Sequence, residues 1–161
     1  MFIQIFLGTV LILLSVVVAA VGFGLYELGL RRAHKWLITE PHAPKLFVVL
    51  ASAVITVLWM VTAGVWIWTL AFRGLGMFAH LEEALYFSLT AFTTLGFGDL
   101  LLPQEWRLLG GMAAVNGFLN FGMMTALLIE VLRHVRRNQI DALRQAREEA
   151  AKNALGSGPN P

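Results

Sequence analysis

Between two long apolar segments the chain reads Thr93-Thr94-Leu95-Gly96-Phe97-Gly98-Asp99. Glycine adopts positive φ without the steric penalty of a Cβ atom, and here two glycines alternate with Leu95 and Phe97. Alternating left- and right-handed backbone would turn successive carbonyl oxygens toward one line instead of to opposite sides. Such a row of oxygens can replace the water around a dehydrated cation, with the Thr94 hydroxyl beneath it, once four copies surround the ion. One chain alone cannot build such a path.

The same stretch resembles the filter of the tetrameric potassium channels, which in its commonest form reads Thr-Thr-Val-Gly-Tyr-Gly-Asp. The similarity continues through residues 83–89 and 116–122 and covers about residues 46–132. It implies a homotetramer that conducts K⁺ as its permeant ion, with no other cofactor. The implied filter residues are Thr94, Leu95, Gly96, Phe97 and Gly98, with K⁺ held at the first four.

The resemblance also implies residues that support the filter, namely Thr93, Tyr86 and Asp99. Tyr86 stands where the family has a tryptophan that braces the matching carboxylate, so we expect its phenol to bond Asp99. The alternative is that Asp99 is a solvated loop carboxylate. We expect the Leu95 and Phe97 side chains to pack behind the carbonyls against the pore helix. These two residues depart from the family's valine and tyrosine, and the bulkier, more flexible leucine affects the expected selectivity more than the expected conduction.

Composition places the chain in lipid. Of its 161 residues, 58% are hydrophobic and 14% charged, and the mean hydropathy is +0.72, whereas a soluble domain is about a quarter charged. The chain has no cysteine, which excludes disulfides and thiolate metal sites. A net charge of +2 is too small to indicate nucleic acid. No Ser/His/Asp constellation or phosphate loop is present, so we expect neither catalysis nor a small-molecule substrate.

Three segments lack charged residues over the length, about 20 residues, that a spanning helix needs: 1–26, 46–72 and 108–129. A cleaved signal peptide is an alternative for the first, but no basic region precedes it. Residues 81–92 look helical but are too short to span, which predicts a re-entrant helix. Glu82 and Glu83 at its start complement the helix dipole.

The predicted fold is an all-α membrane protein with three spanning helices, a re-entrant pore helix and a filter loop, completed as a tetramer. The predicted segments are an N-terminal transmembrane helix 1–30, a cytoplasmic loop 31–45, a pore domain 46–132 (outer helix 46–72, pore helix 81–93, filter 94–99, inner helix 107–132), a cytoplasmic helix 133–155 and a disordered tail 156–161. Residues 133–155 would be a four-chain bundle or a solvated or membrane-surface helix.

Charge distribution predicts the orientation. With the N-terminus outside, the cytoplasmic loop and the C-terminal region carry ten basic residues, whereas the outer side carries only Arg73 and Arg107. The positive-inside rule therefore puts the filter's Asp99 end outside and the C-terminus in the cytoplasm of a multi-pass plasma or inner membrane protein. Basic residues at the inner side could also bind anionic membrane lipid. Trp66 and Trp68 are expected in the outer aromatic belt.

The inner helix leaves two questions open. Gly117 aligns with a gating hinge of the family, although a small residue can equally serve close helix packing. Gly110, Gly111 and Gly122 are expected to serve such packing. The candidate cavity residues are Phe121 and Thr125 by alignment, and Asn116 and Asn120 by polarity. We favour the first pair, because buried asparagines could instead bond a neighbouring helix.

The sequence therefore predicts a potassium-selective channel that passes K⁺ down its gradient. The alternatives are a weakly selective cation channel on the same fold and a non-conducting regulatory subunit. No spanning segment carries a ladder of arginines, so a voltage sensor of the usual kind is not expected.

Overall fold

The computed structural model describes residues 1–32 and 42–156, all of whose regular elements are helices. In chain order these are α1 (Phe2–Arg32), α3 (His42–Gly74), α4 (Leu81–Phe92), the short 3₁₀-helix η1 (Gln104–Trp106) and α5 (Arg107–Gly156). Three of them, α1, α3 and the first part of α5, are long and apolar enough to cross a membrane. The predicted all-α class with three spans is confirmed.

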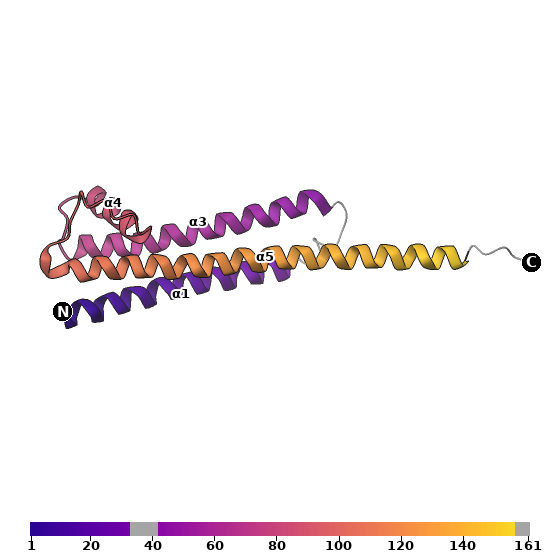
Figure 1. Cartoon of the computed structure of the whole chain (residues 1–161), viewed down its shortest axis with the longest axis horizontal. Coiled ribbons are helices and arrows are strands. Elements are labelled where there is room, and N and C mark those ends of the chain that lie inside the picture. Colours follow the sequence, from indigo (N-terminus) through magenta and orange to yellow (C-terminus); the bar gives the residue numbers. More distant parts are fainter. Residues whose placement is uncertain (33–41, 157–161) are drawn as a thin grey trace, which may run out of the picture.

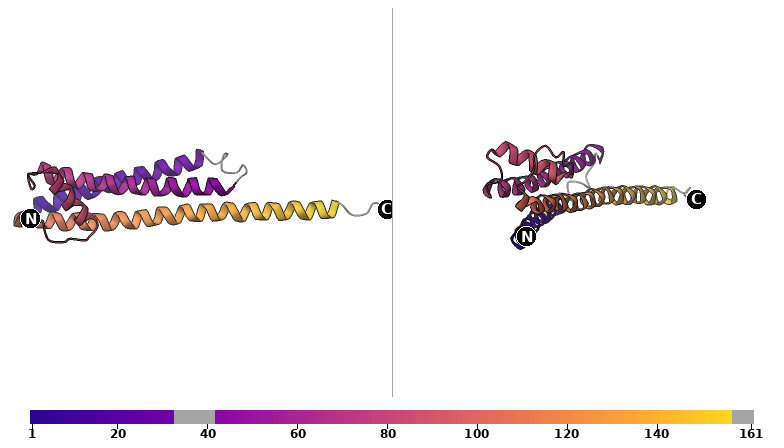
Figure 2. Two further views of the ribbon diagram at one scale, coloured as in Figure 1. Left: turned by 90° about the horizontal axis from the view of Figure 1, so that it is seen from above. Right: turned by 60° about the vertical axis from the view of Figure 1, so that its left-hand side comes forward.

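The three long helices lie side by side, and α4 folds back at the end where α3 finishes and α5 begins (Figure 1). The N-terminus lies at this same end, where the Gln4 amide donates a hydrogen bond to the backbone oxygen of Glu105. The end of α5 lies at the opposite end, because α5 projects well past the other helices (Figure 2). The segment that follows α4 and the end of α5 are therefore at opposite ends of the described structure.

Aromatic side chains attach α4 to α3. The ring of Phe72 is 5.6 Å from Trp68 and 5.2 Å from Phe87, and the Phe87 ring is 5.3 Å from Phe78. Trp68 and Phe72 are completely buried. The prediction that Trp68 belongs to a lipid-facing belt is therefore wrong, because α4 packs over that side of α3, whereas Trp66 remains partly exposed.

α1 packs along α3 and α5 of its own chain, which the sequence could not predict. In its N-terminal half Gly8 lies so close to α5 that an added Cβ would be 2.3 Å from the Met112 sulfur. At mid-length Ala19 contacts Met60 of α3 and Met124 of α5. Near its C-terminal end the Tyr26 hydroxyl donates to the Val49 oxygen at 3.0 Å. α1 is thus part of the helical core along its whole length.

The predicted inner helix 107–132 and the predicted helix 133–155 are parts of one unbroken helix, because α5 runs to Gly156 and residues 133–155 include no proline or glycine. The loop predicted over 31–45 is shorter at both ends, since α1 ends at Arg32 and α3 begins at His42. Pro44 falls in the first turn of α3, where a missing N–H costs no helix bond. The middle of that loop, 33–41, lies outside the described residues, as does the predicted tail 156–161 beyond Gly156.

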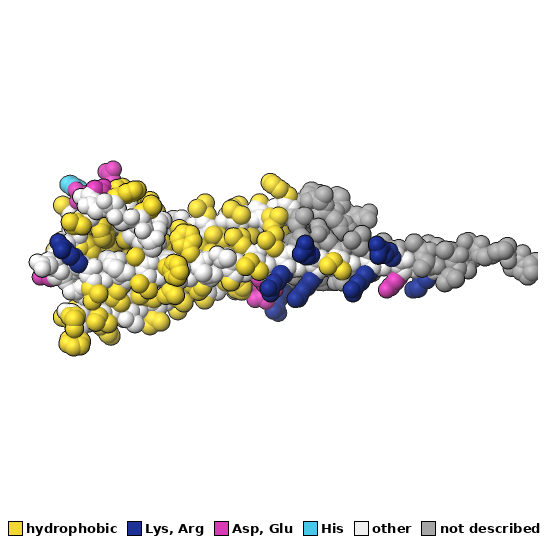
Figure 3. Space-filling model, viewed as in Figure 1, with side chains coloured by type: hydrophobic (Ala, Val, Ile, Leu, Met, Phe, Trp, Pro, Cys, Tyr) yellow, Lys and Arg dark blue, Asp and Glu magenta, His cyan; other side chains and the backbone are white. Residues whose placement is uncertain are grey.

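The predicted pore helix is one residue too long, because Thr93 follows the last residue of α4 as its C-cap. The surface agrees with the division into a spanning part and a projecting part. Hydrophobic side chains cover the end that contains α4, and lysine and arginine side chains gather along α5 where that cover ends (Figure 3).

Candidate functional site

The segment 93–99 has an alternating backbone. Thr94, Gly96 and Gly98 have positive φ, at 60°, 54° and 80°, whereas Leu95 and Phe97 between them do not. Two of these positions are the glycines for which the sequence predicted left-handed backbone. The third is unexpected, because a β-branched residue with positive φ is an outlier. Strained residues of this kind occur mostly at functional sites.

The start of the segment is tied to the last turn of α4. A helix leaves its final carbonyls without partners in the helix, and here the following amides and one hydroxyl supply them. The Thr90 oxygen accepts two of these bonds. The bonds are Thr93 N to Leu89 O (3.0 Å), Thr94 N to Ala91 O (2.9 Å), Leu95 N and Gly96 N to Thr90 O (2.9 and 3.2 Å) and Thr93 Oγ1 to Leu89 O (2.7 Å). The last carbonyls of α4 therefore shape the start of the segment.

At the far end of the segment Tyr86 and Asp99 meet. The Tyr86 hydroxyl donates to Asp99 Oδ2 at 2.7 Å, the contact that the resemblance implied. This hydrogen bond holds the pKa of the Asp99 carboxyl below its usual value. The same bond raises the pKa of the Tyr86 phenol above its usual value. The bond links the middle of α4 to the end of the segment, so α4 holds the segment at both ends.

The side chains between these two anchors are exposed in the single chain. Leu95 and Phe97 are 61% and 67% exposed. The α4 of the same chain therefore does not cover these two side chains. Packing against the pore helix of a neighbouring chain stays a prediction.

Gly117 of α5 lies directly against the end of α4. A Cβ added to Gly117 would be 1.8 Å from the backbone oxygen of Phe92, the last residue of α4. Of the two interpretations of Gly117, close packing explains this contact without a hinge. Gly110 is also packed, but an added Cβ at Gly111 or Gly122 would meet no described atom within 4 Å, so the packing expectation is wrong for these two within one chain.

The candidate cavity residues separate into two groups. Phe121 is 47% exposed, and Thr125 is exposed with its hydroxyl bonded to the Phe121 oxygen at 2.9 Å. Asn120 is 1% exposed, and its amide donates to Ser15 Oγ of α1 at 3.2 Å. The prediction that Asn120 lines a cavity is therefore wrong, because α1 covers that side of α5. Asn116 is likewise completely buried.

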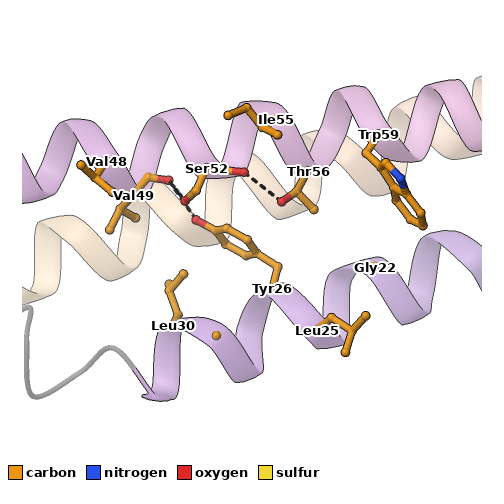
Figure 4. A pocket seen from close by; sticks show the side chains of 11 residues that line it. Gly22, Leu25, Tyr26, Leu30, Val48, Val49, Ser52, Ile55, Thr56 and Trp59 are labelled. Carbon is orange, nitrogen blue, oxygen red and sulfur yellow. Dashed lines mark hydrogen bonds between the residues drawn. The ribbon is translucent and has the colours of Figure 1, made fainter.

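Two grooves flank the C-terminal half of α1, away from the segment 93–99, which we name the filter segment after the sequence prediction. The groove between α1 and α3 has a volume of about 580 Å³ and apolar walls that include Leu25, Ile55 and Trp59 (Figure 4). Its hydroxyls already donate to backbone oxygens: Tyr26 and Ser52 to Val49, and Thr56 to Ser52. The groove between α1 and α5 has a volume of about 750 Å³. Neither groove includes residues of α4 or of the filter segment.

Comparison with known families decides the class of this site. A family model described as "Ion channel" matches residues 47–134, more than half of the 161-residue chain. The chain belongs to this ion channel family. The match includes α4, the filter segment and the spanning part of α5, and it leaves α1 outside. Searches among curated proteins and among solved structures gave no match.

Ser15 and Thr90 make contacts that the sequence did not predict. The Thr90 backbone oxygen accepts hydrogen bonds from the amides of Leu95 and Gly96, and the Ser15 hydroxyl accepts one from the Asn120 amide. The signal that could have found the Thr90 contact is general, since the last carbonyls of any helix need donors. Nothing in the sequence pointed to Ser15, because the contact of a serine within an apolar span is known only once the packing of that span is known.

Proposed function

We propose that this ion channel is a homotetramer that conducts K⁺ selectively and passively, and that it is not an enzyme. Four copies of residues 94–98 would surround the ion path, with K⁺ at backbone oxygens of Thr94 to Phe97 and at the Thr94 hydroxyl. The observation that carries the proposal is the alternating positive φ at Thr94, Gly96 and Gly98. Alternation directs successive carbonyls to one side, which is what a carbonyl-lined filter requires.

The strain at Thr94 supports a function for this backbone. Positive φ at a non-glycine residue costs about 1–3 kcal/mol and persists only where the surroundings impose it. Here the Thr94 amide is bonded to the Ala91 oxygen, and the next two amides are bonded to the Thr90 oxygen. The hydrogen bonds to the end of α4 thus hold Thr94 in a backbone conformation that a threonine otherwise avoids.

The exposed apolar side chains support assembly. Leu95, Phe97, Phe118 and Phe121 are 61%, 67%, 72% and 47% exposed in the single chain. They belong to the filter and to the adjoining part of α5, where a four-fold pore would bring neighbouring chains together. In the proposed tetramer the neighbouring subunits cover the filter side chains that their own α4 leaves bare.

The charges support one orientation in the membrane. The last turn of α1 includes Arg31 and Arg32, and α5 carries Arg133, Arg136 and Arg137 at and beyond the end of its span. The N-terminus and the filter loop share the other end of the molecule. By the positive-inside rule the filter loop and N-terminus face outward and the C-terminal helix is cytoplasmic.

A weakly selective cation channel is the second candidate. It is favoured by the departures from the potassium-channel filter at Leu95 and Phe97, whose side chains would have to be held by the neighbouring subunits. A leucine is more flexible about χ1 than a valine and defines the space behind a carbonyl less tightly.

The test is the reversal potential of the purified full chain in a planar bilayer, with K⁺ on one side and Na⁺ on the other. A reversal near the K⁺ equilibrium potential supports the proposal. Current that reverses near zero supports the weakly selective channel. Absence of current at all voltages, pH values and lipid compositions, with a tetramer present in detergent, contradicts both and supports a non-conducting subunit.

A further inference from the structure

α1 lies outside the region that matches the ion channel family. Its residue Ser15 nevertheless lies near Phe92, the residue before the proposed filter, in a buried layer behind that filter. Ser15 of α1 is 2% exposed, and it faces Asn120 of α5, which is 1% exposed. A polar pair at mid-span has no water to bond, so the two side chains depend on each other and on their own helices. This polar pair is a specific connection between α1 and α5.

The hydrogen bonds at Asn120 divide between two helices. Its amide nitrogen donates to Ser15 Oγ at 3.2 Å, to the Asn116 backbone oxygen at 2.9 Å and to Asn116 Oδ1 at 3.0 Å. Two of the three acceptors are in α5 itself. Removing the Ser15 hydroxyl would therefore leave Asn120 with partners, and would abolish only the bond that crosses between helices.

The pair lies in the same contact layer as the end of α4. A Cβ added to Gly64 of α3 would be 2.9 Å from the Phe92 ring and 3.4 Å from Ser15 Oγ. Gly117, three residues before Asn120, lies against the Phe92 backbone oxygen. Phe92 is completely buried and is the last residue before the filter segment. All four helices thus meet around the residue from which the filter starts.

We infer that Ser15 is a positioning residue for conduction, which holds α5 against the end of α4 through its bond to Asn120. A shift of α5 at the level of Gly117 would carry Asn120 away from Ser15 and would release the backbone of Phe92. The Thr93–Gly96 amides, which take their shape from the last carbonyls of α4, would lose their support. The inference rests on the proposed function, because it assigns to α1 a part in keeping that filter conductive.

The first test compares single-channel currents of the full-length wild type, Ser15→Ala and Thr9→Ala. Thr9 is the matched control, because it lies in α1 but its hydroxyl donates only to the Ile5 oxygen of its own helix, at 2.7 Å. We expect Ser15→Ala to lower the open probability at least about threefold, with unitary conductance and reversal potential unchanged, since no filter ligand is altered. An open probability equal to that of Thr9→Ala would overturn the inference.

A cycle with Asn120→Ala tests the route of the effect. Ser15→Ala should have much less effect on open probability in the Asn120→Ala background, since the bond is already absent there. Equal effects in both backgrounds would show that Ser15 acts by another contact and would overturn the inference.

Hydrogen exchange separates this inference from the proposed function, because it needs no current. In the purified assembly, Ser15→Ala should speed exchange of the Leu95 and Gly96 amides, which bond the Thr90 oxygen. Thr9→Ala should not. A silent wild type with this exchange pattern would contradict the proposed conduction but would retain the positioning role, whereas unchanged exchange would refute the positioning role itself.

Discussion

The filter segment, residues 93–99, and the buried layer behind it, where Ser15 bonds Asn120, both contain polar groups. They differ in how far a single chain buries and bonds their side chains. In the filter segment the chain supplies backbone bonds at the start and the Tyr86 bond at the end, and leaves Leu95 and Phe97 more than half exposed. In the layer behind it, Ser15 and Asn120 are almost fully buried and bonded within one chain. In a single chain the filter segment thus leaves two large side chains uncovered, whereas the layer behind it is packed and bonded within that chain.

This difference predicts separate consequences for mutations in the two regions. Changes in the filter segment should affect conduction more than folding, because the single chain makes few side-chain contacts there. Changes in the buried layer should affect folding and assembly as well, because four helices meet around Phe92.

The largest expected effect is the loss of flux in Gly96→Ala. Gly96 has a φ of 54°, so a Cβ is strained there, although no described atom lies within 4 Å of its position. We expect K⁺ flux into vesicles to be abolished while the tetramer persists. Gly24→Ala is the control, since Gly24 is also in open space but has helical backbone. Selective current in Gly96→Ala would remove the filter assignment.

The next effect is on stability, in Gly117→Ala. The new methyl would meet the Phe92 backbone oxygen at 1.8 Å, and a backbone atom cannot rotate away. We expect the thermal midpoint of the assembly to fall, with a loss of stability of about 1–3 kcal/mol per chain or more. Gly122→Ala in the same helix meets no described atom within 4 Å and should leave the midpoint nearly unchanged. A Gly117→Ala protein as stable as the control would contradict the packing described for this contact.

A moderate effect is expected from Tyr86→Phe, which keeps the ring but removes the hydroxyl that bonds Asp99. The filter loses one of its two attachments to α4, so sustained K⁺ current should fall several-fold while the tetramer remains intact. The only other tyrosine is Tyr26, whose hydroxyl donates to the Val49 oxygen near the end of α1 that is far from the filter segment. Tyr26→Phe is therefore the control for loss of a phenolic hydroxyl. Unchanged current in Tyr86→Phe would mean that the bond does not support the filter.

The smallest effect concerns pH. The pKa of Asp99 is lowered in the folded protein, so the bond contributes stability above the unfolded value of about 3.9 and loses it as pH falls through the lower folded pKa. The pKa of Tyr86 is raised in the folded protein. The stability that its protonated phenol contributes is therefore complete below the unfolded value of about 10 and is lost as pH rises through the folded pKa. Flux of the wild type should therefore not change through this pair between about pH 5 and 9. Below about pH 5 and above about pH 9, the flux of the wild type should change because the Tyr86–Asp99 bond is lost, and Tyr86→Phe should not show this change. Vesicle flux measured against pH tests this.

Much of the fold could be predicted from residue order. Three uncharged stretches predicted three spans, and the short segment before the filter predicted α4 within one residue of its end. The boundary between the loop and the second span was predicted less well, because α3 begins at His42 and Pro44 is compatible with its first turn. Helices were predicted over 107–132 and 133–155, and the structure joins them into one, because a change from apolar to charged residues leaves the helix intact.

The candidate site divides in the same way. The alternating glycines and the Tyr86–Asp99 pair were predictable, the former from backbone sterics and the latter from the family resemblance. The positive φ of Thr94 was not, because it is imposed by the bonds to α4 against the preference of the residue. Asn120 was a cavity candidate by polarity alone, and the open alternative, that it bonds a neighbouring helix, is the one the structure shows, with Ser15 of α1 as its partner.

Residue types and their spacing were enough to predict the spans, the short helix α4 and the positive φ of Gly96 and Gly98, because length, charge and the freedom of glycine act locally along the chain. Packing between segments far apart in the sequence determined the rest: the burial of Asn120 against Ser15, the contact of Gly117 with Phe92, and the place of α1. The physical reason is that a lipid-soluble helix is apolar on nearly every side, so its sequence does not show which side meets a neighbouring helix.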